Sequence, residues 1–348
     1  MPAPDAQPPA GPAAQPAPGP DGRPAPAPAL VSLAEIQAAA RRLAGVALRT
    51  PLVPLAGTGP ALLLKPESLQ ATGSFKVRGA YNAISALPPE LRERGVVAHS
   101  SGNHAQAVAY AAALLGVPAT VVIPDGAPAV KVSAASRLGA TIVRCEPSLA
   151  ARVAVTGEQA ARFGYAIIPP FEHRDVIAGQ GTIGLEIAAD CPDADLIVCP
   201  VGGGGLISGI AAAAAALLPG ARVVGVEPEL AADARDSLRA RRRVAWRAAD
   251  TNQTIADALR ADQVGELPLR HLLSQVHDIV TVSEDQIRAA MRRLATSGRL
   301  VAEPGGAVAV AACLHGGGLL PAASRPVAVL SGGNVEPALL AAVLGGSE

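Results

Sequence analysis

The feature that most constrains this chain is a repeated alternation of short apolar runs with longer segments of helical pattern that are rich in Ala and Leu. The apolar runs predict strands at Ala61–Lys65, Val96–His99, Thr120–Ile123, Thr141–Arg144, Leu196–Val201, Val223–Glu227, Ile279–Val282 and Val327–Leu330. Such alternation predicts an α/β fold in which helices cover both faces of a mainly parallel sheet. Ligands of these sheets bind at the carboxyl ends of strands, so a site is expected in the turns that follow the strands.

The N-terminal segment has a different composition. Residues 2–28 consist almost entirely of Pro, Ala, Gly and Gln, which cannot bury enough apolar surface to fold. We expect residues 1–28 to be disordered and dispensable, and they lack the cationic start and apolar centre of a secretory signal. Ordered structure is expected to begin at Ser32, which has the capping-box spacing to Glu35.

Charge and cysteine content exclude several classes of protein. The formal net charge is +0, which argues against nucleic acid or an anionic membrane as the main partner. None of the four cysteines belongs to a Cys-x-x-Cys pair, which indicates a reduced, cytoplasmic chain. We find no purely apolar segment of about 18 residues or more, and therefore predict no membrane span.

The stretch Thr72–Ala80 has Lys76 at its centre. Only three of the 29 Lys and Arg residues in this chain are lysines. Arginine does not lose its proton, whereas a lysine flanked by apolar residues such as Phe75 and Val77 can act as an amine nucleophile. Lys76 is therefore a candidate for amine chemistry, with a solvated surface lysine as the alternative.

A second polar turn follows the predicted strand Val96–His99. Ser100–His104 brings Ser, Asn and His side chains to the start of a helix, at Asn103 or just after. Free amides and the helix dipole favour an anion there. A polar helix cap beside a histidine is the alternative.

Two glycine-containing turns follow later strands. Gly202–Gly205 leads into an Ala-rich helix, so its N–H groups can surround an anion. It lacks both the Gly-Lys-Ser/Thr of a Walker loop and the Gly-x-Gly-x-x-Gly spacing of a dinucleotide site, which leaves a phosphate monoester as the expected guest. In Ser331–Asn334 a hydroxyl is placed where it could bond a ring nitrogen, although a plain turn is the simpler interpretation of this segment alone.

An amine lysine, a phosphate loop and an anion loop on an open α/β frame together point to pyridoxal phosphate. The sequence resembles the fold-type II pyridoxal-phosphate enzymes, in the branch of threonine/serine dehydratases (ammonia-lyases) and serine racemase. The resemblance runs from about Ser32 to the C-terminus and rests on Gly73–Ala80, Ser100–His104, Ile177–Thr182, Gly202–Gly205, Thr254–Asp257 and Ser331–Asn334. It implies two open, twisted, mainly parallel sheets of the tryptophan synthase beta type, with a large cofactor-binding domain at 29–83 and 173–348 and a small domain at 84–172.

The resemblance also implies a role for each site residue. Lys76 would hold the cofactor as a Schiff base and then remove the substrate α-proton, and Ser101 would act from the opposite face of the cofactor. Cofactor contacts are implied for Phe75, Lys76, Asn103, Gly202, Gly203, Gly204, Gly205 and Ser331: Asn103 at the ring hydroxyl, the glycines at the phosphate and Ser331 at the pyridine nitrogen. The substrate carboxylate would be received by Ser100, Ser101, Asn103 and His104.

The activity implied is elimination from a hydroxy amino acid: L-threonine to 2-oxobutanoate and ammonia, or L-serine to pyruvate and ammonia, with 3-hydroxyaspartate also open. One alternative is an amino-acid racemase on the same frame. Another, of a different class, is a protein that binds pyridoxal phosphate without catalysis. A cytoplasmic homodimer or homotetramer is expected.

A divalent cation site and two departures complete the comparison. Serine racemase-like enzymes imply Mg²⁺ or Ca²⁺ at Glu227, the carbonyl of Ala231 and Asp233, and the alternative is that the two acids only cap the next helix. The family usually has Gly where this chain has Ala258, and Ser or Thr where it has Gly305. Both departures bear on substrate preference.

Overall fold

The computed structural model describes residues 29–57, 62–100, 102–126, 129–315 and 318–346. The predicted tail at 1–28 and the predicted site residue Ser101 lie outside these ranges. Helix α1 begins directly after Ser32, whose side chain and that of Glu35 form the predicted capping box.

Two sheets form the frame, as predicted. The six-stranded sheet has the order β1 (Val53–Leu55), β2 (Leu62–Pro66), β10 (Pro326–Leu330), β7 (Leu196–Pro200), β8 (Arg222–Pro228) and β9 (Asp278–Val282). The four-stranded sheet has the order β5 (Thr141–Cys145), β4 (Ala119–Pro124), β3 (Val96–His99) and β6 (Ala166–Ile167). All strand pairs are parallel except β1 with β2. The short edge strands β1 and β6 were not predicted, because runs of three and two residues carry too little pattern.

Helices lie between the strands along the chain. The α-helices are α1 (Leu33–Leu43), α2 (Lys76–Ser85), α3 (Pro89–Arg94), α4 (Asn103–Leu115), α5 (Ala129–Arg137), α6 (Leu149–Phe163), α7 (Arg174–Asp190), α8 (Gly205–Leu217), α9 (Asp233–Ala240), α10 (Ala248–Thr251), α11 (Glu266–Gln275), α12 (Glu284–Arg293), α13 (Pro304–His315) and α14 (Pro337–Gly345). Shorter turns of helix are η1 (Glu67–Leu69), η2 (Asp257–Leu259) and η3 (Leu294–Gly298). None of the helices in the described ranges is long and apolar enough to cross a bilayer.

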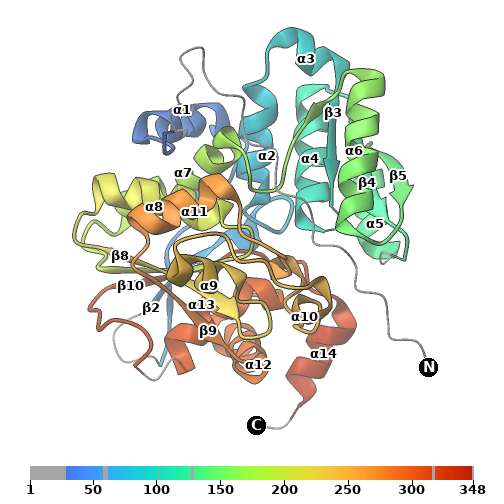
Figure 1. The fold of residues 1–348 in the computed structure, drawn as a ribbon. Coiled ribbons are helices and arrows are strands. Elements are labelled where there is room, and N and C mark those ends of the chain that lie inside the picture. The colour runs from blue at the N-terminus through green and yellow to red at the C-terminus, as the bar shows by residue number, and fades with distance from the viewer. Residues whose placement is uncertain (1–28, 58–61, 101, 127–128, 316–317, 347–348) are drawn as a thin grey trace.

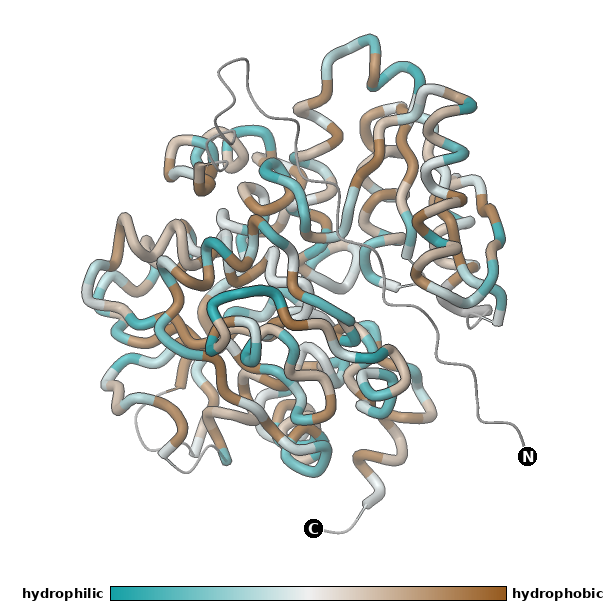
Figure 2. The backbone as a smooth tube through the Cα atoms, in the orientation of Figure 1, coloured by the Kyte–Doolittle hydropathy of each residue, from teal (hydrophilic) through white to brown (hydrophobic). Residues whose placement is uncertain are grey.

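Both sheets are covered on both faces, as an apolar parallel sheet requires. One apolar cluster joins the six-stranded sheet to α12 and α13, and another joins it to α7 and α8. In the smaller sheet, α2, α4 and α5 share clusters with one face and α6 packs against the other. Figure 1 shows the smaller sheet with α4, α5 and α6 at the upper right, and Figure 2 shows apolar residues concentrated along the strands inside both groups.

The stretch Thr72–Ala80, called the lysine turn from here on, is held in position by the close crossing of α2 and α7. A Cβ added to Gly179 on α7 would lie 2.7 Å from the Cα of Gly79 on α2, so the two backbones touch where a side chain would separate them. The side chain of Gln180 then accepts a hydrogen bond from the N–H of Gly79 at 3.1 Å. The motif Ile177–Thr182 therefore holds the helix that begins at Lys76.

Candidate active site

The lysine turn and the turn after β10 form one unit, although 255 residues separate Lys76 from Ser331 in the sequence. The N–H of Phe75 donates to the carbonyl of Ser331 at 3.1 Å, and the N–H of Gly333 donates to the carbonyl of Gly73 at 2.9 Å. These backbone bonds act like a short strand pairing. They fix the position of Lys76 relative to the end of β10 without using any side chain.

Lys76 is the first residue of α2. Its Nζ donates to the carbonyl oxygen of Pro170 at 2.7 Å and lies 5.1 Å from the ring centre of Phe75. Burial lowers the pKa of Lys76 to about 8, and the negative charge of Glu303 only partly opposes this shift. The amine is therefore much closer to deprotonation at neutral pH than an ordinary lysine.

The glycine loop lies against the segment that binds the lysine. A Cβ added to Gly203 would lie 2.2 Å from the ring of Phe171, the residue after Pro170, so no side chain fits there. In the described structure the N–H groups of Gly202–Gly204 have no hydrogen-bond acceptor, and Gly205 begins α8. A row of free amides before a helix start fits a phosphate group.

Asn103 begins α4, as the sequence predicted, and connects the two sheets. Its Nδ2 donates to Oε1 of Glu303 at 2.6 Å, and its Oδ1 accepts from Nδ2 of Asn334 at 2.8 Å. Asn103 thus lies between the loop of the smaller sheet and the turn after β10.

The rest of the Ser100–His104 loop is held by local bonds. The hydroxyl of Ser100 accepts from the N–H of Gly102 at 3.1 Å. His104 is buried, and its Nε2 lies 2.8 Å from the carbonyl of Ile168, which can only accept, so Nε2 carries the proton. Burial and the charge of Lys76 lower the pKa of His104 to about 3. Since the ring is neutral and its Nδ1 carries no proton, His104 can donate to a substrate carboxylate only through its backbone N–H.

Several polar atoms around these turns are without partners. The hydroxyl of Ser331 is nearly buried and makes no hydrogen bond to a described residue. Thr72 Oγ1, Ser74 Oγ and His104 Nδ1 are buried and likewise unpaired. Buried polar groups are rarely left unpaired, so their clustering here indicates a polar guest. Free amides, an unpaired hydroxyl and a deprotonation-prone lysine are the groups that pyridoxal phosphate requires.

A family model described as pyridoxal-phosphate dependent enzyme matches residues 31–332 of this chain. The match covers the strands of both sheets and the turns described above as far as Gly332. The chain belongs to this family.

Two curated relatives place the pyridoxal-phosphate enzyme among lyases. It is 42% identical over 295 residues to L-threo-3-hydroxyaspartate ammonia-lyase of Saccharomyces cerevisiae, covering 83% of this chain and 88% of that protein. It is 41% identical over 317 residues to L-threonine ammonia-lyase of Thermotoga maritima, covering 88% and 76%. Among solved structures, maize serine racemase superposes with a TM-score of 0.86 at 36% identity, over 90% of this chain and 96% of that one. The protein is therefore a pyridoxal-phosphate dependent lyase.

Glu303 is the site residue to which the sequence assigned no role. It is nearly buried, its negative charge acts on the amine of Lys76, and its carboxylate contacts Asn103 directly. A signal was present, since Glu303 is the only acid between Asp285 and Glu336 and precedes an apolar helix. The sequence pattern could not show that this acid contacts Asn103, which is 200 residues away.

The two departures from the family pattern touch each other. A Cβ added to Gly305 would lie 3.2 Å from the Cβ of Ala258 and 3.2 Å from Cγ of Leu259. The methyl gained at Ala258 thus occupies space next to the side chain that is lost at Gly305. The two substitutions therefore compensate each other in volume at one place and are not two independent changes.

Behind Lys76, a buried ion network joins β2, α2 and α7. Arg78 donates to Glu67 at 2.8 Å and to Glu186 at 2.7 Å, and Lys65 donates to Glu186 at 2.5 Å. The hydroxyl of Thr50 donates to Glu67 at 2.8 Å. Arg78, Lys65 and Glu67 are almost completely buried, so their charges are balanced within the network.

The predicted cation site shows features of both interpretations. Both carboxylate oxygens of Glu227 cap α9, accepting from the N–H groups of Ala234 at 3.0 Å and Arg235 at 2.7 Å. Both oxygens of Asp233 are buried and make no regular hydrogen bond to a described residue, although the N–H groups of Asp233 and Val264 partly oppose the rise in the pKa of Asp233 that burial causes. Ala231 is also buried. Burial and the charge of Asp233 raise the pKa of Glu227 well above its usual range. In the described residues no group of three or more His, Cys, Asp or Glu is arranged to hold a metal. The buried Asp233 oxygens are the observation that fits a cation.

Proposed function

We propose that this enzyme dehydrates and deaminates a hydroxy amino acid, converting L-threonine, L-serine or 3-hydroxyaspartate to a 2-oxo acid and ammonia. The observation that carries the proposal is the amine of Lys76, whose pKa burial lowers to about 8 and whose hydrogen bond goes to the neutral carbonyl of Pro170. Such an amine can bond a cofactor carbonyl and accept a proton from carbon near neutral pH. The names of the two ammonia-lyase relatives support the same reaction.

Pyridoxal phosphate, when bound, supplies a reactive carbonyl and a sink for electrons from the substrate α-carbon. The free amides of Gly202–Gly204 are the groups that would hold its phosphate, and the unpaired hydroxyl of Ser331 would meet its ring nitrogen. A hydroxyl does not keep that nitrogen protonated, as a carboxylate would. The Ser331 hydroxyl would therefore suit an elimination, in which the β-hydroxyl leaves promptly. Lys76 would be the base that receives the α-proton.

The test is a panel assay for 2-oxo acid and ammonia with L-threonine, L-serine and L-threo-3-hydroxyaspartate. The holoenzyme is expected to release both products in equal amounts from at least one of the three. Lys76→Ala is expected to release none while keeping the wild-type circular dichroism spectrum. A yellow holoenzyme that turns over no member of the panel would instead support a binding protein without catalysis.

Racemisation is a second candidate, favoured by the similarity to maize serine racemase. It would use Ser101 as the acid and base on the cofactor face opposite Lys76. Chiral chromatography after incubation with L-serine measures it directly. Ser101→Ala is expected to reduce racemisation more than elimination from L-threonine, and equal losses would contradict the two-face assignment.

We also propose a structural divalent cation, Mg²⁺ or Ca²⁺, at Glu227, the carbonyl of Ala231 and Asp233. Hard cations prefer oxygen ligands, and a cation would neutralise two carboxylates that are buried together. EDTA is expected to lower the melting temperature of the wild type, and magnesium to restore it. Asp233→Ala is expected to abolish the response to both. A wild type indifferent to both treatments would leave Glu227 as a helix cap only.

A cytoplasmic homodimer or homotetramer is proposed from the family resemblance alone. Analytical ultracentrifugation of the holoenzyme at several concentrations separates these two states from a monomer.

A further inference from the structure

The start of helix α11 is in direct contact with the glycine loop. The N–H of Gly265 donates to the carbonyl of Gly203 at 3.2 Å. A Cβ added to Gly204 would lie 2.7 Å from the Cβ of Pro268 and 3.0 Å from Cγ2 of Val264. Figure 1 shows α11 beside α8, the helix into which the loop leads. The first turn of α11 therefore supports the loop on one side.

Glu172 caps this helix, although 94 residues separate it from Glu266. Gly265, the residue before α11, has no side chain with which to cap it. Instead, Oε2 of Glu172 accepts from the N–H of Glu266 at 2.6 Å, and Oε1 accepts from the N–H of Leu267 at 2.9 Å. A carboxylate in this place satisfies two amides that have no partner within the helix, and it interacts favourably with the helix dipole.

The residue before Glu172 supports the loop as well. A Cβ added to Gly203 would lie 2.2 Å from the ring of Phe171, and a Cβ added to Gly205 would lie 2.9 Å from the Cβ of Phe171. Because glycines have no side chains to pack, the shape of the loop depends on what lies against its backbone. Glu172 joins the two supports, since its backbone continues from Phe171 and its carboxylate binds α11.

We propose that Glu172 is a positioning residue for the cofactor phosphate. It holds Phe171 and the start of α11 together around the glycine loop, so that the amides of Gly202–Gly204 keep the arrangement that a phosphate needs. This inference rests on the proposed function, in which these amides hold the phosphate. The carboxylate of Glu172 is bonded to α11 and acts on the phosphate only through the loop. Donors held in place bind an anion more tightly, because less conformational freedom is lost on binding.

The test compares the dissociation constants of pyridoxal phosphate and of pyridoxal, which lacks the phosphate. Both are measured by equilibrium dialysis of the full chain, with visible absorbance as the readout. Glu172→Ala is expected to raise the dissociation constant of pyridoxal phosphate by about 3- to 30-fold and that of pyridoxal by less than about 2-fold. Glu172→Gln keeps one of the two acceptor oxygens, so its effect is expected to be smaller than that of Glu172→Ala.

Asp195 provides a matched control. Its two carboxylate oxygens also accept from consecutive backbone N–H groups, those of Ser324 at 2.6 Å and Arg325 at 2.9 Å. Asp195 precedes β7, whereas the glycine loop follows that strand, so these bonds lie at the opposite end of the strand. Asp195→Ala is expected to lower the melting temperature as Glu172→Ala does, but to leave both dissociation constants unchanged. A general loss of stability is thereby separated from positioning.

Three results would overturn the role of Glu172. Glu172→Ala could leave the affinity for pyridoxal phosphate at the wild-type value, tighten it by removing a negative charge, or weaken the affinity for pyridoxal equally. If the alanine variant does not fold, the same comparison is made with Glu172→Gln.

Gly203→Ala separates this inference from the proposed function. If Gly203→Ala weakens pyridoxal phosphate binding and Glu172→Ala does not, the loop holds the phosphate and only the inference fails. If Gly203→Ala does not weaken it, the loop does not hold the phosphate and the inference fails with that assignment. If both variants weaken it but the wild type turns over no hydroxy amino acid, the proposed reaction is wrong and the role of Glu172 stands.

Discussion

Lys65 is fully buried and Lys76 is partly buried, and the two lysines have very different surroundings. Lys65 donates to the carboxylate of Glu186 at 2.5 Å and to the carbonyl of Thr50 at 2.5 Å, within a network whose charges are balanced. Among the described residues, Lys76 donates only to the neutral carbonyl of Pro170, with the charge of Glu303 nearby, and its pKa falls to about 8. The difference teaches that burial by itself does not prepare an amine for chemistry. The amine must also lack a carboxylate partner in direct contact.

The largest expected effect comes from exchanging each lysine for arginine. Lys76→Arg keeps the charge but removes the amine, so 2-oxo acid release is expected to fall by about 1,000-fold or more. Mass spectrometry after borohydride reduction is expected to find no cofactor on the chain. Lys65→Arg, the matched control, is expected to keep both the bound cofactor and turnover. If Lys76→Arg still carried covalent cofactor, the attachment would not depend on the amine of Lys76, and the contrast between the two lysines would be wrong.

For stability we expect the opposite order: replacing Lys65 matters more than replacing Lys76. Lys65→Met leaves Glu186 with Arg78 as its remaining partner, and we expect the free energy of unfolding to fall by about 3 kcal/mol. Urea unfolding of the cofactor-free protein measures this loss. Enzyme that remains folded is expected to bind cofactor at Lys76 as the wild type does. If Lys65→Met instead lost cofactor attachment without losing stability, Lys65 would belong to the site.

The carbonyl that binds Lys76 depends on the glycine loop, because Phe171 follows Pro170 and lies against Gly203. Gly203→Ala places a methyl within 2.2 Å of the Phe171 ring, an overpacking that typically costs about 1–3 kcal/mol. We expect the cofactor dissociation constant to rise by about 10-fold or more. Gly220→Ala is the control, since a Cβ there meets no atom within 4 Å. Equal affinities in the two variants would show that the loop does not hold the phosphate.

The smallest expected effect is a shift in pH dependence. The rate of cofactor attachment to the apoenzyme is expected to rise with pH around a midpoint of about 8, where Lys76 loses its proton. Because the negative charge of Glu303 raises the pKa of Lys76, Glu303→Gln is expected to move this midpoint lower. Stopped-flow absorbance across a pH range of about 6.5–10, which brackets the midpoint, measures both. A midpoint that moved up in Glu303→Gln would contradict the assigned sign.

The same shift has a consequence for stability. The folded pKa of Lys76 lies below the unfolded value of 10.5, so the folded state resists protonation of this amine. The stability contributed by the neutral amine is full above about pH 10.5 and is lost as pH falls through about 8. In the apoenzyme, Lys76→Met is therefore expected to flatten the rise in unfolding free energy between these two values.

The sequence by itself determined the strands, the helix starts and the turns that carry chemistry. Each predicted strand is present within a residue or two, and α4 begins at Asn103 as expected. Ser32 and Glu35 form the predicted capping box. These features depend on neighbours within a few residues, so apolar periodicity and cap chemistry are sufficient to specify them.

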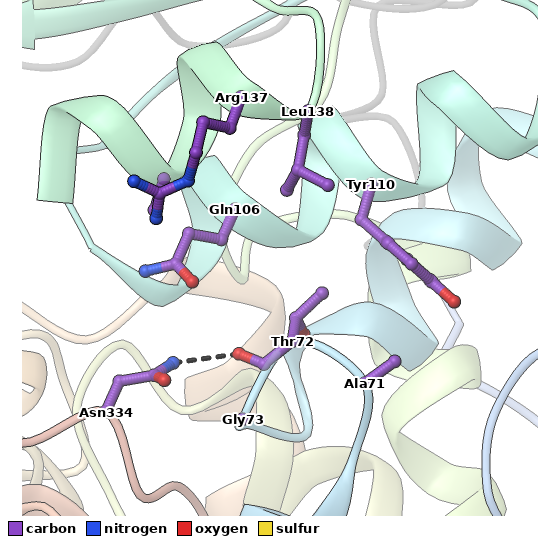
Figure 3. A pocket seen from close by; sticks show the side chains of 9 residues that line it. Ala71, Thr72, Gly73, Gln106, Tyr110, Arg137, Leu138 and Asn334 are labelled. Carbon is purple, nitrogen blue, oxygen red and sulfur yellow. Dashed lines mark hydrogen bonds between the residues drawn. The ribbon is translucent and has the colours of Figure 1, made fainter.

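Only the tertiary structure decided which of these pieces meet. The carbonyl of Pro170 reaches Lys76 from 94 residues away, and Glu303 reaches Asn103 from 200 residues away. Thr72 and Arg137, 65 residues apart in the sequence, line one cavity (Figure 3). Contacts of this kind depend on how helices and sheets pack across the whole chain. No local pattern records them, because a residue's sequence neighbours are the same whatever lies against its side chain.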